Sequence, residues 1–324
     1  MKTAILVGDC VKMMKYLPDG RVNCCVTSPP YFGLRDYGHE GQIGLEETPE
    51  QYVARLVEVF REVRRVLRDD GTLWLNLGDS YAAQRSGTHQ PAETLAGGKG
   101  GKMEDGSIVN RDRHAGYNPT RNASAIGLKH KDLIGIPWRA AFALQADGWY
   151  LRQDIIWHKP NPMPESVTDR CTKAHEYIFL LSKSPKYYFD HEAIKEQAVG
   201  GTPGNTKPTK GGRAYADGET KHRTAANLHK IGPVERRNRR SVWTVATKPF
   251  KGAHFATFPP SLVEPCILAG CPEGGLVLDP FGGSGTTGMV ANQHGRNAIL
   301  TELNPEYAEI ATSRIASVGG EVVR

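Results

Sequence analysis

A short segment near the start of the chain has the groups needed to hold a planar base by its amino group. Thr27-Ser28-Pro29-Pro30-Tyr31 combines a hydroxyl, two consecutive prolines and an aromatic ring. Proline fixes φ at about −65° and has no N–H, so the carbonyls of Ser28 and Pro29 can point at a donor without a competing backbone bond. Tyr31 would then stack on the base. The alternative is an ordinary turn at the end of a strand, because Ser-Pro-Pro segments are common in turns.

A glycine-rich segment near the other end of the chain suits a nucleoside. Residues 275–287 predict a buried strand, a turn with glycines at 282, 283 and 285, and the start of a helix. The next expected strand ends in Glu302, whose carboxylate suits the two hydroxyls of a ribose. Residues 283–288 also fit the dinucleotide fingerprint G-x-G-x-x-G, whereas no Lys precedes the Thr pair, which argues against a P-loop. A tight turn without a ligand is the alternative.

Together the two segments resemble the motifs of amino-directed DNA methyltransferases that use S-adenosylmethionine, in the group whose catalytic motif precedes its cofactor motif. The resemblance implies the catalytic residues Ser28, Pro29, Pro30 and Tyr31. The residues that it implies for the cofactor are Asp9, Cys10, Thr27, Phe258, Asp279, Pro280, Phe281, Gly282, Gly283, Ser284, Gly285, Thr286, Glu302 and Leu303. Gly8-Asp9-Cys10 is similar to the family segment whose acid contacts the adenine amino group of the cofactor. Segments 148–164, 175–181 and 254–263 are also similar to family segments. Together with the catalytic motif, the glycine turn and Glu302, these make seven matches in a consistent order.

The order of the motifs argues against a dinucleotide enzyme and against a protein substrate. After the glycine turn only one helix, one strand and a final helix remain, too little to complete a dinucleotide domain. Methyltransferases of proteins or RNA with a related Pro-Pro-Tyr motif normally carry it after the glycine turn, whereas here it lies about 250 residues before it. DNA is therefore the expected substrate.

The expected chemistry is direct methyl transfer to the exocyclic amine of a base that has flipped out of the duplex. The lone pair of such an amine is delocalised into the ring, so two fixed acceptors, the Ser28 Oγ and the Pro29 carbonyl, must draw the nitrogen toward tetrahedral geometry. In the family, Ser at the first motif position tends to accompany cytosine N4 and Asp adenine N6, so Ser28 favours cytosine. Adenine N6 and a catalytically silent DNA-binding relative stay open. A C5-cytosine mechanism would need a nucleophilic cysteine, but Cys266 lies in an apolar helix pattern.

The elements that must position these motifs follow from hydrophobic patterning. We predict strands at 3–8, 22–27, 72–77, 150–157, 176–182, 276–279 and 297–302, and helices at 49–67, 132–146, 260–270, 286–294 and 305–315. Seven strands with helices between them predict a doubly wound, mostly parallel α/β sheet, a Rossmann-like methyltransferase fold. The arginines of the first long helix suit a solvated face and are left out of the site.

Two segments interrupt this pattern. Residues from about 82 to 127 are glycine-rich and polar, which fits either a loop that orders over DNA or surface disorder. Residues 199–240 carry ten Lys or Arg against three acids, a local net charge of +7, so the rest of the chain sums to −1. The family carries its target-recognition region here, and the candidate DNA-binding residues are Arg236, Arg237, Asn238, Arg239 and Arg240, with a solvated linker as the alternative. We expect a catalytic part at 1–190, a basic target-recognition region at 191–245 and a cofactor-binding part at 246–324.

Composition fits a soluble enzyme that acts on double-stranded DNA. The 324 residues have a net charge of +6 and are 39% hydrophobic, and no apolar run reaches the ~18 residues of a membrane span. The first residues lack the length and flanks of a signal peptide, so we expect a cytoplasmic protein of bacterial, archaeal or phage origin. The six cysteines form no C-x-x-C pair, so no metal is expected, and Cys24, Cys25 and Cys266 suit core positions. The recognition sequence, a restriction endonuclease partner and the oligomeric state stay open.

Overall fold

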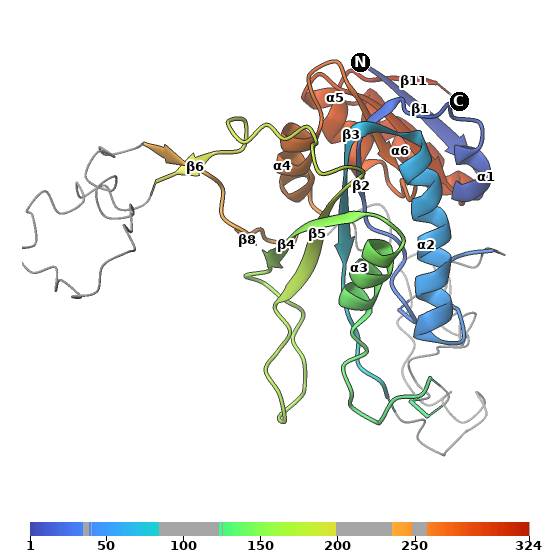
Figure 1. Ribbon diagram of the computed structural model, residues 1–324, viewed down its shortest axis with the longest axis vertical. Coiled ribbons are helices and arrows are strands. Elements are labelled where there is room, and N and C mark those ends of the chain that lie inside the picture. Colours follow the sequence, from blue (N-terminus) through green and yellow to red (C-terminus); the bar gives the residue numbers. More distant parts are fainter. Residues whose placement is uncertain are drawn as a thin grey trace, which may run out of the picture. The chain divides into compact units, whose positions relative to one another are not determined.

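The computed structural model describes residues 1–34, 39, 41–83, 123–124, 126–198, 235–247 and 258–323 (Figure 1). The chain forms two compact units, one of Met1–Phe189 with Ser241–Arg324 and the other of Asp190–Arg240. The larger unit contains both motifs, although they come from opposite ends of the chain. Most of the predicted interruption at 82–127, and residues 199–234 of the basic insert, lie outside the described residues.

A sheet forms the centre of the larger unit, and in the described residues it has nine strands in the order β11-β1-β10-β9-β2-β3-β5-β4-β8. The strands are β1 (Lys2–Val7), β2 (Val22–Thr27), β3 (Leu67–Leu77), β4 (Tyr150–His158), β5 (His175–Ser182), β8 (Val242–Thr244), β9 (Leu276–Asp279), β10 (Asn297–Glu302) and β11 (Glu321–Val323). Neighbours are parallel except at β5, which runs antiparallel to β3 and β4. The mostly parallel α/β prediction is confirmed. All seven predicted strands are present, and the two additional ones, β8 and β11, are three-residue edge strands too short to show an alternating pattern.

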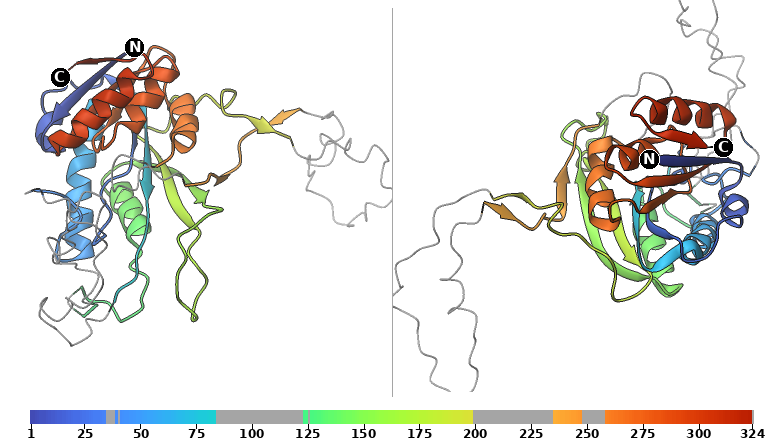
Figure 2. Two further views of the ribbon diagram at one scale, coloured as in Figure 1. Left: turned by 180° about the vertical axis from the view of Figure 1, so that it is seen from behind. Right: turned by 90° about the horizontal axis from the view of Figure 1, so that it is seen from above.

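Helices cover both faces of the sheet (Figure 2). Helices α1 (Cys10–Met14), α2 (Pro49–Val66) and α3 (Ile136–Ala146) share one apolar core with Cys25 and Leu73 of the sheet. Helices α4 (Pro260–Gly270), α5 (Thr286–Gln293) and α6 (Pro305–Ala316) cover the opposite face, where α4 packs on Cys24 and Trp74. Successive strand residues thus face different helix layers, as the doubly wound prediction requires. No helix in the described ranges is long and apolar enough to cross a membrane.

Local capping explains where the helices begin. Thr48 and Gln51 form a reciprocal capping box at the start of α2, which ends one residue before the predicted boundary. The predicted helix 132–146 begins only at Ile136. It cannot start earlier because Leu133 forms a β-bridge with Tyr81, and the Asp79 carboxylate accepts from the N–H groups of Gly135 and Ile136.

Strands from the two ends of the chain meet in the middle of the sheet. In β2 and β9, Cys24 lies beside Val277 and Cys25 beside Leu278. In β1 and β10, Val7 lies beside Glu302. The carboxyl ends of these four parallel strands therefore lie at one edge, where open α/β sheets bind their ligands.

The smaller unit is described at its two ends, residues 190–198 and 235–240. There β6 (Glu196–Gln197) pairs antiparallel with β7 (Arg236–Arg237). Glu196 Oε1 accepts from Arg237 Nε at 2.8 Å and from Arg240 Nε at 2.7 Å. Strand pairing and ion pairs thus join the two ends of the basic insert.

Candidate active site

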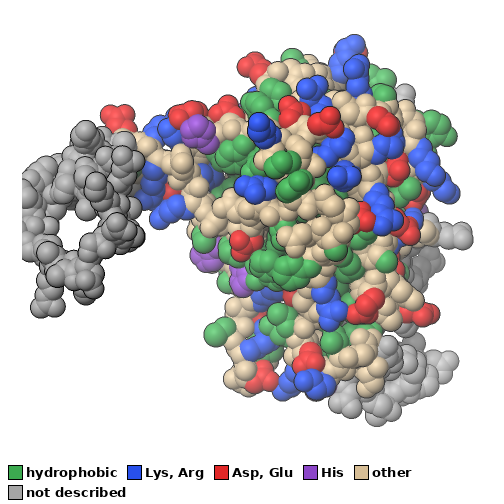
Figure 3. All heavy atoms as spheres, in the orientation of Figure 1, with side chains coloured by type: hydrophobic (Ala, Val, Ile, Leu, Met, Phe, Trp, Pro, Cys, Tyr) green, Lys and Arg blue, Asp and Glu red, His purple; other side chains and the backbone are tan. Residues whose placement is uncertain are grey.

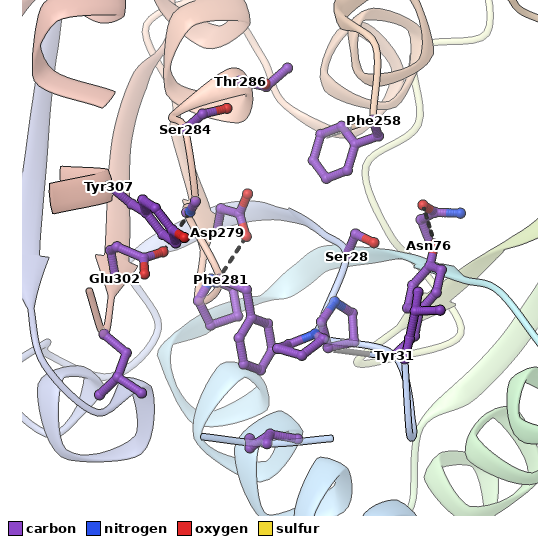
Figure 4. A pocket seen from close by; sticks show the side chains of 18 of the residues that line it. Ser28, Tyr31, Asn76, Phe258, Asp279, Phe281, Ser284, Thr286, Glu302 and Tyr307 are labelled. Carbon is purple, nitrogen blue, oxygen red and sulfur yellow. Dashed lines mark hydrogen bonds between the residues drawn. The ribbon is translucent and has the colours of Figure 1, made fainter. Parts of the chain in front are cut away.

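A cavity of about 650 Å³ opens at the carboxyl ends of the parallel strands in the larger unit (Figure 4). The predicted site residues that line it are Asp9, Cys10, Ser28, Pro29, Pro30, Tyr31, Phe258, Asp279, Pro280, Phe281, Gly282, Gly283, Ser284, Thr286, Glu302 and Leu303. Thr27 and Gly285 lie behind this lining, where Thr27 bonds to Asp279 and Gly285 packs on Ala311. The structure therefore brings the two sequence motifs to one cavity.

The glycine turn after β9 has its shape because side chains are excluded from it. A Cβ on Gly282 would lie 2.9 Å from the Leu300 Cβ, and one on Gly285 would lie 2.7 Å from the Ala311 Cβ. Gly283 differs, because a Cβ there would meet only the Phe281 carbonyl oxygen, at 3.9 Å, although its φ of +50° disfavours other residues. Gly282 and Gly285 thus allow the turn to pack closely, and Gly283 leaves open space in the cavity.

Asp279 stabilises this turn through hydrogen bonds to its buried carboxylate. Its carboxylate accepts from Thr27 Oγ1 and Thr287 Oγ1, both at 2.6 Å, and from the Phe281 N–H at 3.0 Å. The residue is 1% exposed, and burial raises the pKa of its carboxyl group. Both oxygens are occupied by protein donors, so Asp279 fixes the geometry of the loop.

Glu302 has a carboxylate at the cavity wall. Its Oε2 accepts from the Gly283 N–H at 2.7 Å, and its Oε1 accepts from the Asn304 N–H at 2.9 Å. Burial raises the pKa of this carboxyl group. Each oxygen keeps a further lone pair, so the two can still accept from a vicinal diol. These remaining acceptor positions, beside the open space at Gly283, fit the ribose and the adjoining chain of a nucleoside such as S-adenosylmethionine.

Asp9 and Cys10 lie at the end of β1. Asp9 caps α1, where Oδ1 accepts from the Lys12 N–H at 2.9 Å, and its Oδ2 lies 3.4 Å from Arg55 Nη2. Burial raises the pKa of the Cys10 thiol to about 12, so this group is neutral. The contact predicted for Asp9 with an adenine amino group would have to use the remaining lone pairs of its oxygens.

The Ser28–Tyr31 segment leaves β2 directly into the cavity. Tyr52 Oη donates to the Pro30 carbonyl at 2.8 Å, so that carbonyl is occupied. Among the described residues, none donates to the Pro29 carbonyl, which was the predicted acceptor. A Cβ on Gly78 would lie 2.5 Å from Tyr31 Cε2, so only glycine at that position leaves room for the Tyr31 ring.

Sequence reasoning assigned no role to three polar residues beside Tyr31. Tyr31 Oη lies 2.7 Å from Glu176 Oε2 and 3.2 Å from Asn76 Oδ1. The Lys159 ammonium pairs with Glu176 Oε1. These residues come from the ends of β3, β4 and β5, and only the antiparallel direction of β5 brings Glu176 to this edge. An earlier signal was available, since Lys159 and Glu176 lie in segments that resemble the family.

Arg236 to Arg240 belong to the smaller unit, and their role in DNA binding stays a prediction. Arg236 Nη2 donates to the Lys195 carbonyl at 3.0 Å, and Arg237 and Arg240 share Glu196. On the face of the larger unit that Figure 3 shows, acidic and basic side chains are interspersed.

Buried cysteines occupy the core. Cys24, Cys25 and Cys266 are at most 1% exposed, which confirms the core positions predicted for them. Cys266 Sγ donates to the Leu262 carbonyl within α4 at 3.4 Å. Among the described residues, no group of three or more His, Cys, Asp or Glu side chains is arranged to hold a metal ion.

Comparisons with known proteins match DNA methyltransferases. The DNA methylase family model (N6_N4_Mtase) matches residues 22–313. The type II methyltransferase M.Cfr9I of Citrobacter freundii is 47% identical over 317 residues, which cover 98% of this chain and 89% of the relative. M.SmaI of Serratia marcescens is 47% identical over 311 residues, covering 96% and 90%. Among solved structures, PvuII DNA methyltransferase (cytosine-N4-specific) has a TM-score of 0.61 at 18% identity, covering 99% of this chain and 94% of the other. A putative DNA modification methylase from Thermus thermophilus, complexed with S-adenosyl-L-methionine, has a TM-score of 0.56 at 22% identity, covering 100% of both chains.

Proposed function

Because this chain belongs to the DNA methylase family of N6- and N4-directed enzymes, we propose that it methylates the N4 atom of cytosine at specific sites in double-stranded DNA. The predicted resemblance is confirmed at the level of the family: the protein is a type II DNA methyltransferase that uses S-adenosylmethionine. The choice of cytosine N4 over adenine N6 goes beyond the family membership and is our proposal.

The observation that carries the choice of cytosine is Ser28 at the first position of the catalytic motif, at the cavity wall. Ser28 Oγ and the Pro29 carbonyl would accept the two N–H bonds of the amine. That pull localises the nitrogen lone pair and stabilises the positive charge that develops on the nitrogen. Tyr31 would stack on the flipped base, its ring supported by Gly78.

The cofactor-binding residues would lie on the other side of the cavity. Glu302 would accept from the ribose hydroxyls, Gly283 would leave room for the methionine part, and Phe258 and Phe281 would contribute apolar wall. The bound sulfonium supplies an electrophilic methyl group. The protein contributes alignment, since direct transfer requires the amine and the methyl carbon in line.

DNA would be held in part by Arg236, Arg237, Asn238, Arg239 and Arg240, through phosphate contacts and base edges. The cavity lies at the edge of the sheet and has room for a single base more readily than for a DNA duplex. The target base must therefore leave the duplex to reach Ser28. We further propose a cytoplasmic location and a restriction endonuclease with the same recognition sequence as partner, as type II systems imply.

Identification of the modified nucleoside tests this proposal. Unmethylated duplex DNA is incubated with the protein and S-adenosylmethionine, digested to nucleosides and analysed by mass spectrometry. We expect 4-methylcytosine, and much less of it with the Ser28→Ala variant. A product of 6-methyladenine alone would refute the base assignment and keep the reaction class. DNA binding without any methylated nucleoside would favour the silent relative.

A further inference from the structure

The Tyr31 hydroxyl lies between two hydrogen-bond acceptors. Its oxygen is 2.7 Å from Glu176 Oε2 and 3.2 Å from Asn76 Oδ1. A phenol has one proton, and both neighbours accept it. The proton therefore lies on the side of these two acceptors, of which Glu176 is the nearer, and the lone pairs of the Tyr31 oxygen are left for a donor on another side.

Two contacts fix the orientation of the Asn76 amide. Its Nδ2 donates to the Tyr177 carbonyl at 3.0 Å and to Glu176 Oε2 at 3.3 Å. A flipped amide would place its oxygen against these two acceptors, so the hydrogen-bond partners assign Oδ1 to the side of Tyr31. Asn76 thus reinforces the direction in which Tyr31 donates.

Lys159 provides the charge that makes Glu176 an acceptor. The side chains of Lys159 and Glu176 are 18% and 14% exposed, and the Lys159 ammonium also lies 4.3 Å from the centre of the Trp157 ring. A carboxylate paired with an ammonium can only accept hydrogen bonds. Its second oxygen therefore faces Tyr31 as an acceptor.

Ser28 has the complementary requirement. For the proposed methylation its oxygen must accept from the target amine, but the hydroxyl also carries a proton that has to point elsewhere. Figure 4 shows the Ser28 oxygen turned toward the side of the cavity where Tyr31 and Asn76 lie.

We propose that the Lys159–Glu176 pair sets the direction of a hydrogen-bond chain in which Ser28 donates to Tyr31 and Tyr31 donates to Glu176. The lone pairs of Ser28 then stay available to the target amine. Lys159 and Glu176 are positioning residues in this chain, since they act through Tyr31. The inference rests on the proposed function and adds to it the reason why a serine hydroxyl serves as an acceptor.

The protonation state of Tyr31 agrees with this direction. Burial, followed by the charge of Glu176, raises the pKa of Tyr31 well above its ordinary value, while the Ser28 hydroxyl opposes the rise. The phenol therefore keeps the proton that it donates to Glu176 throughout the neutral pH range.

Tyr31→Phe and Glu176→Gln test the chain. Phenylalanine keeps the stacking ring but removes the acceptor for the Ser28 proton, and an amide at position 176 can turn an N–H toward Tyr31. We expect each change to lower the single-turnover rate of methyl transfer about tenfold, the usual effect of one lost hydrogen bond, with unchanged affinity for S-adenosylmethionine and DNA. The double variant should be no slower than the slower single variant, because both changes break the same chain.

Lys159→Met tests the charge that sets the direction of the chain. Without the ammonium, the Glu176 carboxylate loses its paired cation, so we expect the single-turnover rate of methyl transfer to fall while the affinities for S-adenosylmethionine and DNA stay unchanged. The Lys159→Met, Glu176→Gln double variant should be no slower than the slower single variant, because both changes act on the same acceptor. The matched control is Lys131→Met, which removes a lysine paired with Asp169 at 2.6 Å on the surface and should leave the rate unchanged.

Two results would overturn the chain while wild-type methylation, and thus the proposed function, stands. One is additive losses in the Tyr31→Phe, Glu176→Gln double variant, and the other is an unaltered rate of methyl transfer for Lys159→Met. A wild-type protein that methylates no DNA would overturn both the function and the chain.

Discussion

The two sides of the cavity hold their functional groups in different ways. On the cofactor side, formed by the glycine turn and Glu302, backbone N–H groups bind the carboxylate and missing side chains give the turn its shape. The base side is formed by Ser28 to Tyr31 with Asn76, Lys159 and Glu176. Here side chains that lie in or just after four strands bind one another. The cofactor side should therefore be sensitive to an added side chain at a glycine position. The base side should be sensitive to the loss of a single polar atom.

The largest effect should come from the base side. Ser28→Ala removes an acceptor that acts on the developing charge, so we expect the single-turnover rate to fall about 100-fold or more. The affinity for S-adenosylmethionine should stay unchanged, because this hydroxyl lies on the base side of the cavity. Radiolabelled methyl transfer and calorimetry measure the two quantities. Full activity in this variant would remove Ser28 from the chemistry.

On the cofactor side, Gly283→Leu should weaken S-adenosylmethionine binding about 100-fold. A side chain there occupies the cavity and must adopt a φ of +50°. Gly20→Leu is the matched control: its φ of +64° imposes similar strain, but no atom lies within 4 Å of the added Cβ. If the control weakens binding equally, backbone strain rather than the cavity is responsible.

Glu302→Gln should reduce cofactor affinity about tenfold, since an amide accepts from hydroxyls less strongly than a carboxylate. The pH dependence is the sharper test. Burial raises the pKa of Glu302, so the ribose acceptor is lost as pH falls through that raised value, earlier than for an ordinary glutamate. Calorimetry across pH should show this loss in the wild type and a flat profile in Glu302→Gln at the same pH values.

The smallest effect on the cavity should come from Arg236, Arg237, Arg239 and Arg240, which lie in the other unit. If about five cations of the insert meet phosphates, log K against log salt has a slope of about −4.5. Neutralising the four arginines should flatten it by about 0.9 per lost contact, with cofactor affinity unchanged. Neutralising Arg61 and Arg68, in α2 and at the start of β3, is the control. An unaltered slope in the fourfold variant would assign DNA binding to another surface.

The two sides also differ in how well sequence reasoning found them. The glycine turn, Glu302 and Ser28 to Tyr31 are contiguous segments with residue types that demand a particular backbone, and the structure places them at one cavity. Asn76, Gly78, Lys159 and Glu176 have no such local mark. Their relevance follows from the antiparallel insertion of β5 between β3 and β4, a long-range pairing that hydrophobic patterning does not specify.

The sequence by itself determined the α/β class, the seven main strands and the two motifs, because glycine, proline and hydrophobic periodicity act through local backbone geometry. The methyltransferase family followed from the resemblance of these motifs to known ones. Only the tertiary structure decided that Asp279 faces inward to three donors, that Gly78 makes room for Tyr31, and that Lys159 and Glu176 meet beside it. These contacts join residues up to 252 positions apart. Which side chains meet at such distances depends on strand order and register, and these are set by the packing of the whole sheet.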